Sequence, residues 1–139
     1  MTSTFAAFTV AYWCVLVAAF LPVLCTGIAK SGMFRVHPKK GGYDNNNPRA
    51  WLARQEGWRG RANAAQANTF EALPFFFAAV IIAHSLQAIQ ARLDLLALLF
   101  IVLRLAYIMM YLADMAKSRS LVWALALLVN IAILFAGYR

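Results

Sequence analysis

Four long apolar stretches constrain this chain more than any other feature of its sequence. They run over about residues 5–28, 69–89, 93–113 and 121–138 of the 139. A helix needs roughly 20 mostly apolar residues to cross a bilayer core of about 30 Å, and each stretch is about that long. A strand barrel is the other structure that can span a bilayer, but its alternating pattern is absent from these continuous runs. The sequence therefore predicts an all-α integral membrane protein, built as a bundle of four transmembrane helices.

Composition leaves little of the chain for a separate soluble domain. Hydrophobic residues make up 63% and charged residues 13%, whereas soluble domains have about 45–50% and about 25%. We therefore expect a single membrane domain over residues 1–139, with one long loop at about 30–60. The chain can become helical again near Pro48, because proline suits the first turn of a helix. The second helix is then expected to start well before its span and to project beyond the membrane.

Basic residues are concentrated on one side of the predicted bundle. Ten of the 13 lie in the first loop or in the turn between the third and fourth spans: Lys30, Arg35, Lys39, Lys40, Arg49, Arg54, Arg59, Arg61, Lys117 and Arg119. The opposite side has only Arg92 and Arg139, and Arg104 lies inside the third span. Because basic loops stay on the cytoplasmic side, we predict a cytoplasmic first loop and outward termini. This bias accounts for the net charge of +8, so no nucleic-acid partner is expected.

The cysteines and histidines do not form a metal-binding pattern. Cys14 and Cys25 lie about three turns apart in one helix, which is too far for a disulfide. We expect both to pack as small core residues. His37 and His84 have no neighbouring ligands in the sequence, so no metal site is expected.

Two polar stripes enter the predicted membrane region from the basic side. The second helix carries three polar residues at i, i+7 and i+10: Arg61, Asn68 and Glu71. The third helix carries four at i, i+3, i+7 and i+10: Arg104, Tyr107, Tyr111 and Asp114. At about 100° per residue, each set lies on one side of its helix.

These stripes have a structural and a functional interpretation. A charge at the centre of a span costs about 2.5–3.5 kcal/mol, so each needs a reason. Structurally, Glu71 and Arg104 could form an ion pair that holds two helices together. A lone pair would not need the surrounding amides and tyrosines, so for the whole set we favour a binding site. Such a site suits a small zwitterionic peptide, with a lipophilic molecule arriving from the membrane. It indicates a reaction that joins or reduces a lipid-soluble electrophile with a water-soluble nucleophile.

The same residues resemble the MAPEG family, the membrane-associated proteins in eicosanoid and glutathione metabolism. The strongest match is the run QANTFEALPFF at residues 66–76, with Asn68, Glu71 and Pro74 in the family's spacing. A second match is FRVHP at residues 34–38, after the first span. A third is the spacing of Arg104, Tyr107 and Tyr111, with Arg119 following them. With four spans and a long first loop, the resemblance covers the whole chain in order.

The resemblance implies a homotrimer in membrane lipid that binds glutathione, as a co-substrate, between neighbouring subunits at the cytoplasmic side. The positions that match the family's glutathione contacts are Asn68, Glu71, Arg104, Tyr107 and Tyr111, with Gln66 and Lys30 as weaker candidates. Arg119 matches the arginine that stabilises the thiolate, after a shift of one residue. The implied activity is a glutathione-dependent transferase or peroxidase that acts on lipophilic electrophiles.

Two positions depart from the family pattern. Ala64 stands where leukotriene-forming members carry Arg, and Ala72 stands where they carry Tyr. Arg61 lies three residues before Ala64, near the same helical column, and is a candidate to replace the missing cation. The departures argue against an eicosanoid synthase. The short chain is similar to the bacterial members of the family, and this similarity implies that the protein lies in a bacterial inner membrane.

Two other functions stay open. The loss at Ala64 favours a non-catalytic trimer that keeps the fold and binds lipid or a protein partner. A small four-helix drug exporter is less favoured, because such exporters place their working carboxylate in the first span, which here has no charge.

Overall fold

The regular structure of the chain is helical throughout residues 8–138, the part that the computed structural model describes. Its four long helices are α1 (Val10–Lys30), α3 (Gly57–Ser85), α4 (Gln90–Leu112) and α5 (Ala116–Leu134). The connection from α1 to α3 contains α2 (Pro48–Ala53) and two 3-10 turns, η1 (Met33–Arg35) and η2 (Pro38–Lys40). Each long helix is long enough and apolar enough to cross a membrane. The chain is thus an integral membrane protein with four candidate spans.

The helix bounds differ from the expected spans at several points. α1 begins at Val10, and residues 5–7 of the expected first span lie outside the described residues. The helix expected to run on from Pro48 is two helices, because α2 ends at Ala53 and α3 begins at Gly57. Gly57 has φ +58°, a left-handed conformation that glycine adopts without a steric penalty. The expected single helix is therefore interrupted at residues 54–56.

α5 begins at Ala116, ahead of the expected start at 121. Lys117 and Arg119 therefore lie in its first turn and not in a free loop. The helix ends at Leu134, while the expected span ran to 138, and Arg139 lies outside the described residues.

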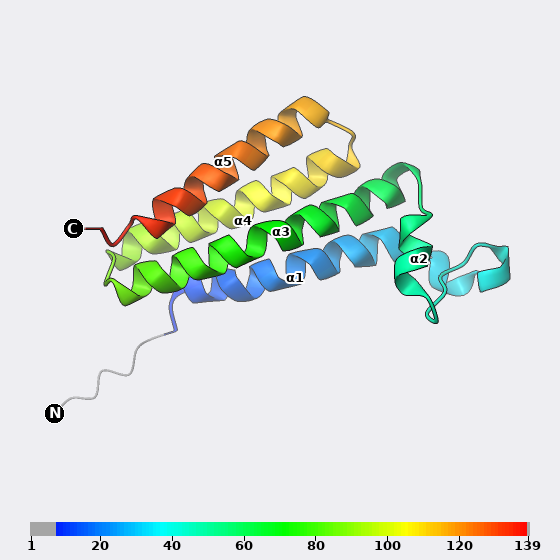
Figure 1. Ribbon diagram of the computed structural model, residues 1–139, viewed down its shortest axis with the longest axis horizontal. Helices are drawn as coiled ribbons and strands as arrows, with labels where there is room; N and C mark the ends of the chain where they lie inside the picture. The colour runs from blue at the N-terminus through cyan, green and yellow to red at the C-terminus, as the bar shows by residue number, and fades with distance from the viewer. Residues whose placement is uncertain (1–7, 139) are drawn as a thin grey trace.

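The four long helices lie side by side with α3 and α4 in the middle (Figure 1). α1 packs on one side of this pair and α5 on the other. Phe76 of α3 and Phe100 of α4 stack face to face in the core, with 4.1 Å between ring centroids. Much of the core consists of small residues that let helices approach closely: Ala11, Ala18, Ala79, Ala83, Ala97 and Ala126.

The bundle has a basic end and a terminal end. The basic end holds the α1–α3 connection and the α4–α5 turn, whereas the start of α1, the end of α5 and the α3–α4 turn lie at the other end (Figure 1). Arg59 donates hydrogen bonds to the carbonyls of Ala29 (2.7 Å) and Ser31 (2.8 Å). A cation at the carbonyl end of a helix satisfies its last acceptors and opposes its dipole. Arg59, in the first turn of α3, therefore has a structural task in holding the end of α1.

The α4–α5 turn fixes how these two helices meet. Asp114 adopts φ +61°, which asparagine and aspartate tolerate better than most residues. Its N–H donates to the carbonyl of Tyr111, and the N–H of Met115 donates to the carbonyl of Met110. This pair of bonds is the Schellman pattern that ends a helix. The tight turn places the first turn of α5, with Arg119, beside the last turn of α4.

Candidate functional site

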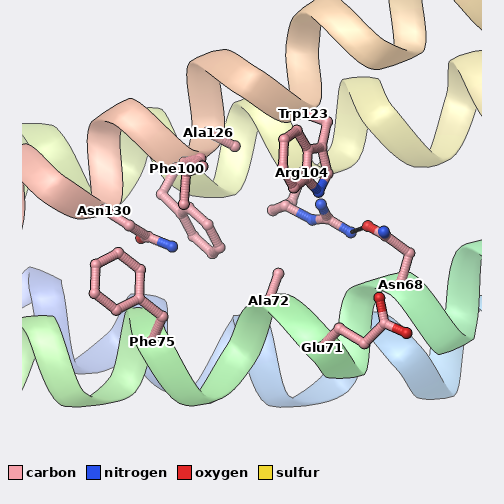
Figure 2. A pocket seen from close by; sticks show the side chains of 10 residues that line it. Asn68, Glu71, Ala72, Phe75, Phe100, Arg104, Trp123, Ala126 and Asn130 are labelled. Atoms are coloured by element: carbon pink, nitrogen blue, oxygen red, sulfur yellow. Dashed lines mark hydrogen bonds between the residues drawn. The ribbon is translucent and has the colours of Figure 1, made fainter.

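Two neighbouring pockets lie among α3, α4 and α5. The first, which we term the mouth pocket, is near the basic end and has a volume of about 200 Å³. Every side chain that lines it carries a polar atom: Asn68, Tyr107, Arg119, Ser120 and Trp123. The second, termed the deeper pocket, measures about 260 Å³ and extends toward the middle of the bundle (Figure 2). Asn68 and Trp123 line both pockets, so the two spaces share a wall.

The deeper pocket is polar at both ends and apolar between them. Asn68, Glu71 and Arg104 lie at the end nearer the mouth pocket, and Asn130 lies at the far end (Figure 2). Alanine, leucine and aromatic side chains line the space between: Ala72, Phe75, Phe100, Ala126 and Leu127. This arrangement suits a mostly apolar ligand with polar groups at its ends.

Arg104 is the best-buried charged group of the site, with 1% of its surface exposed. Its Nη2 donates hydrogen bonds to Oδ1 of Asn68 (3.1 Å) and to Oγ1 of Thr69 (2.9 Å). Its guanidinium also lies over the ring of Tyr107, 4.2 Å from the centroid. Buried as it is, Arg104 orients Asn68 and Tyr107 toward the mouth pocket.

Arg104, Tyr107, Tyr111 and Arg119 form a continuous arginine–tyrosine row along α4 and onto α5. The rings of Tyr107 and Tyr111 pack edge to face, with centroids 5.7 Å apart. The guanidinium of Arg119 lies 4.0 Å from the centroid of Tyr111. Cations over tyrosine rings are held by cation–π attraction. The row thus places a fixed, half-buried cation, Arg119, in the wall of the mouth pocket.

The suggested ion pair between Glu71 and Arg104 is not formed within residues 8–138. Arg104 bonds neutral oxygens on α3, one of them on Thr69, a residue outside both predicted stripes. The side chain of Glu71 lines the deeper pocket but is exposed on the protomer. The reason is the rotation of α3, which turns Thr69 toward α4 and leaves Glu71 on the outer edge.

Three other predicted residues lie away from both pockets. Nζ of Lys30 donates to the hydroxyl of Tyr43 at 2.9 Å. Nε of Arg61 donates to the carbonyl of Leu112 at 3.1 Å, so it caps the end of α4. Gln66 lines a separate pocket of about 350 Å³ between α2 and α3. The structure therefore brings together six of the nine predicted residues: Asn68, Glu71, Arg104, Tyr107, Tyr111 and Arg119.

Sequence reasoning missed three residues that shape this region, and a fourth at the opposite end of the bundle. Thr69 and Trp123 sit beside predicted positions but gave no signal of their own. Asn130 was overlooked although the sequence carried a signal for it. Between residues 121 and 134 it is the single side chain with an amide, hydroxyl or charge. Asp94, near the terminal end, accepts hydrogen bonds from the backbone N–H of Ala11 (2.9 Å) and from Gln90 (2.7 Å). Asp94 was assigned no role, although a carboxylate within the expected third span is itself a signal.

The His, Cys, Asp and Glu side chains of the described residues are dispersed. Across residues 8–138, no group of three or more His, Cys, Asp and Glu side chains is placed to hold a metal ion. Cys14 and Cys25 are free and buried, as the predicted packing role requires.

The family model described as MAPEG family matches residues 10–138 of the chain. Comparison with curated proteins and with solved structures gives no significant match.

Proposed function

The chain belongs to the MAPEG family, and from this premise we propose that it is a glutathione-dependent transferase or peroxidase acting on lipophilic electrophiles. One observation carries the proposal. A polar pocket with a fixed cation adjoins a mostly apolar pocket between spans, and the two share Asn68 and Trp123. A water-soluble thiol in the first and a lipid-soluble molecule in the second would meet at these shared residues.

The mouth pocket has the features that activate a thiol. A free thiol has a pKa of about 8.5, and its thiolate is the nucleophile. A guanidinium remains charged at any working pH and lowers the pKa of a thiol beside it. Arg119 supplies this charge and lies in the first turn of α5, where the helix dipole also favours an anion. The thiolate sulfur then bonds to an electrophilic carbon, and the displaced electron pair goes to the leaving group or to an opened ring oxygen.

The deeper pocket is open between α3 and α5. Glu71 and Trp123, which line it, are both exposed on the protomer. In a membrane this opening faces lipid or another subunit. On the α5 side of the opening, beside Trp123, a lipophilic substrate can reach the pocket from lipid without crossing water.

One face of α3 supports self-association. Five exposed residues lie on it at i, i+3, i+4, i+7 and i+11: Ala67, Phe70, Glu71, Pro74 and Ala78. A carboxylate facing lipid is unfavourable, and small residues allow another helix to approach closely. We infer that a second copy covers this face in the homotrimer that family membership implies. Gln66, on the α2 side of α3, and Lys30, at the end of α1, would then contribute to the site of a neighbouring subunit.

The proposed orientation puts the mouth pocket at the cytoplasmic surface of a bacterial inner membrane. Ten of the 13 basic residues belong to the segments of the basic end, and positive loops favour the cytoplasm. Both termini would then face outward.

Arg119 variants test the catalytic proposal. Arg119→Ala should leave assembly and calorimetric glutathione binding largely intact. It should abolish the ultraviolet thiolate absorbance of bound glutathione near neutral pH. If Arg119 lowers the thiol pKa by about 2 units, the thiolate fraction and turnover of a model electrophile should fall by about 20-fold.

Two further variants serve as controls. Arg119→Lys should recover only part of the signal, because an ammonium lacks the forked geometry of the guanidinium. Lys117→Ala removes a cation from the same turn and should change neither readout. An Arg119→Ala protein with normal thiolate absorbance and turnover would refute the assigned role.

A second candidate function is a non-catalytic trimer that binds lipid or a protein partner. Arg61, the candidate to replace the missing cation at Ala64, is bonded to the carbonyl of Leu112 instead. The site of one protomer therefore lacks that cation. Purified trimer that gives no calorimetric signal with glutathione would favour this function.

A further inference from the structure

Asn130 has hydrogen-bonding capacity that its protein surroundings do not use. It lies on α5 with 3% of its surface exposed. Its Oδ1 is buried and has no hydrogen-bond partner within the described residues. Buried polar side chains are nearly always hydrogen-bonded, and the bilayer core offers no water to replace a missing partner. A carboxamide whose oxygen lacks a partner here therefore calls for a structural or functional explanation.

The side chain is directed into the deeper pocket. Figure 2 shows Asn130 reaching from α5 into the space beside Phe75 and Phe100, at the end away from Arg104, with its amide nitrogen foremost. Trp123, at the shared wall, lies seven residues earlier on α5, which corresponds to about 10 Å along the helix axis. The pocket thus has a polar anchor about 10 Å from the point where it meets the mouth pocket.

Size and lining restrict what can occupy this space. At about 260 Å³ it falls below the roughly 300–1,000 Å³ of ordinary ligand pockets. A compact molecule fits better than a long acyl chain. Phe75, Phe100 and Trp123 present aromatic surface, which favours a flat aromatic body through offset or edge-to-face contacts.

We propose that the deeper pocket selects compact aromatic molecules with a carbonyl oxygen at the end remote from the mouth pocket, and that the amide nitrogen of Asn130 recognises this oxygen. The NH₂ group of a carboxamide has two N–H donors, and a carbonyl oxygen accepts from either of them. The inference rests on the proposed function in placing the electrophile in the deeper pocket. It adds the substrate class and names a specificity-determining residue.

A structural role and a ligand-binding role for Asn130 predict different effects of its replacement on stability. If Asn130 bonds a neighbouring subunit, its replacement by leucine removes that bond and weakens the assembly. If its partner is a ligand, an apolar side chain of similar shape is neutral or stabilising in the empty protein. The mid-point of unfolding in mixed micelles and the oligomeric state of Asn130→Leu separate the two.

The recognition itself is tested with two unreactive probes in the absence of glutathione. Para-acetylbiphenyl carries a carbonyl oxygen, and para-isopropenylbiphenyl replaces that oxygen with a CH₂ group of similar shape. Binding of each to wild type and Asn130→Leu is measured by equilibrium dialysis in one detergent. Partition into micelles is the same for both proteins, so it cancels when the ketone-to-alkene ratios are compared. One neutral hydrogen bond should make the wild-type ratio roughly 2–13 times the variant ratio.

Asn63→Leu is the matched control, because Asn63 lines the separate pocket between α2 and α3. It should keep the wild-type ratio. Equal ratios in wild type and Asn130→Leu, or no binding of the ketone to wild type, would overturn the proposal. A destabilised or dissociated Asn130→Leu would do the same.

A second test of recognition uses wild type alone and needs no variant. The infrared carbonyl band of the bound ketone should lie below its position in detergent, because a hydrogen bond weakens the C=O bond. An unshifted band counts against recognition by Asn130. Glutathione binding is measured separately by calorimetry. Selective ketone binding without glutathione binding would keep this pocket assignment and refute the proposed transferase or peroxidase.

Discussion

The hydrogen bonds of Arg104 should form the strongest polar link between α3 and α4. The perturbations are Arg104→Met, which removes the charge while keeping a long side chain, and Thr69→Val, which removes one acceptor. Thr69 is fully buried and Arg104 is 1% exposed, so neither side chain has water as an alternative partner.

The expected cost follows from the contacts. The bonds to Asn68 and Thr69 are worth about 1.5 kcal/mol each, the upper range for side-chain bonds between membrane helices. The desolvated contact with Tyr107 adds about 2 kcal/mol. Burying the guanidinium in a span opposes these by about 3 kcal/mol. Arg104→Met should therefore lower the free energy of unfolding by about 2 kcal/mol.

A double-mutant cycle isolates the Thr69–Arg104 bond. Unfolding by sodium dodecyl sulfate in mixed micelles, followed by circular dichroism, gives the free energy of unfolding for wild type, both single variants and the double variant. We expect a coupling energy of about 1.5 kcal/mol, because each single variant already loses the shared bond. The hydroxyl of Thr69 also donates to the carbonyl of Ala65 at 2.7 Å, and the cycle cancels that second contribution.

The Glu71→Gln and Arg104→Met pair is the control. These side chains form no ion pair, so their effects should add within about 0.5 kcal/mol. Coupling between Glu71 and Arg104 with none between Thr69 and Arg104 would show that the assignment of Arg104 to neutral partners is wrong.

Three other predictions concern topology and local structure. Single cysteines at Asn46 and Ser118, in a protein whose two native cysteines are replaced by alanine, should both react with an impermeant thiol reagent from the cytoplasmic side only; labelling from outside would reverse the proposed orientation. Asp94→Ala removes the acceptor for the first turn of α1 and should cost about 1 kcal/mol in the same unfolding assay, as the loss of a helix cap does; an unchanged unfolding mid-point would count against this capping role. Gly42→Ala should disturb the basic loop, because a Cβ there would overlap the carbonyl of Val36; limited proteolysis should cut this loop faster than in wild type, and equal rates would mean that the loop can relax.

Much of the candidate site could be predicted because helical periodicity fixes which residues share a face. Tyr107 and Tyr111, four residues apart on α4, had to be neighbours once the third span was identified. Their contact with Arg119 was not implied by periodicity, because it depends on the tight turn at Asp114. Resemblance to a family pointed to Arg119, and the turn supplies the geometric reason.

Sequence alone established the number of spans, the all-helical class and the basic end. These follow from length, hydropathy and charge, which are properties of single segments and need no knowledge of their neighbours. The polar residues of α3 and α4 were likewise visible, because ionisable groups are rare in apolar runs.

Tertiary structure decided which polar groups meet. The rotation of α3 about its axis determines that Thr69, and not Glu71, faces Arg104, and periodicity within a helix does not specify that rotation. The end of α4 likewise engages Arg61, and the packing of α3, α4 and α5 leaves the space into which Asn130 points. These outcomes depend on how side chains of several helices fill one volume together, so they arise only when the whole bundle packs.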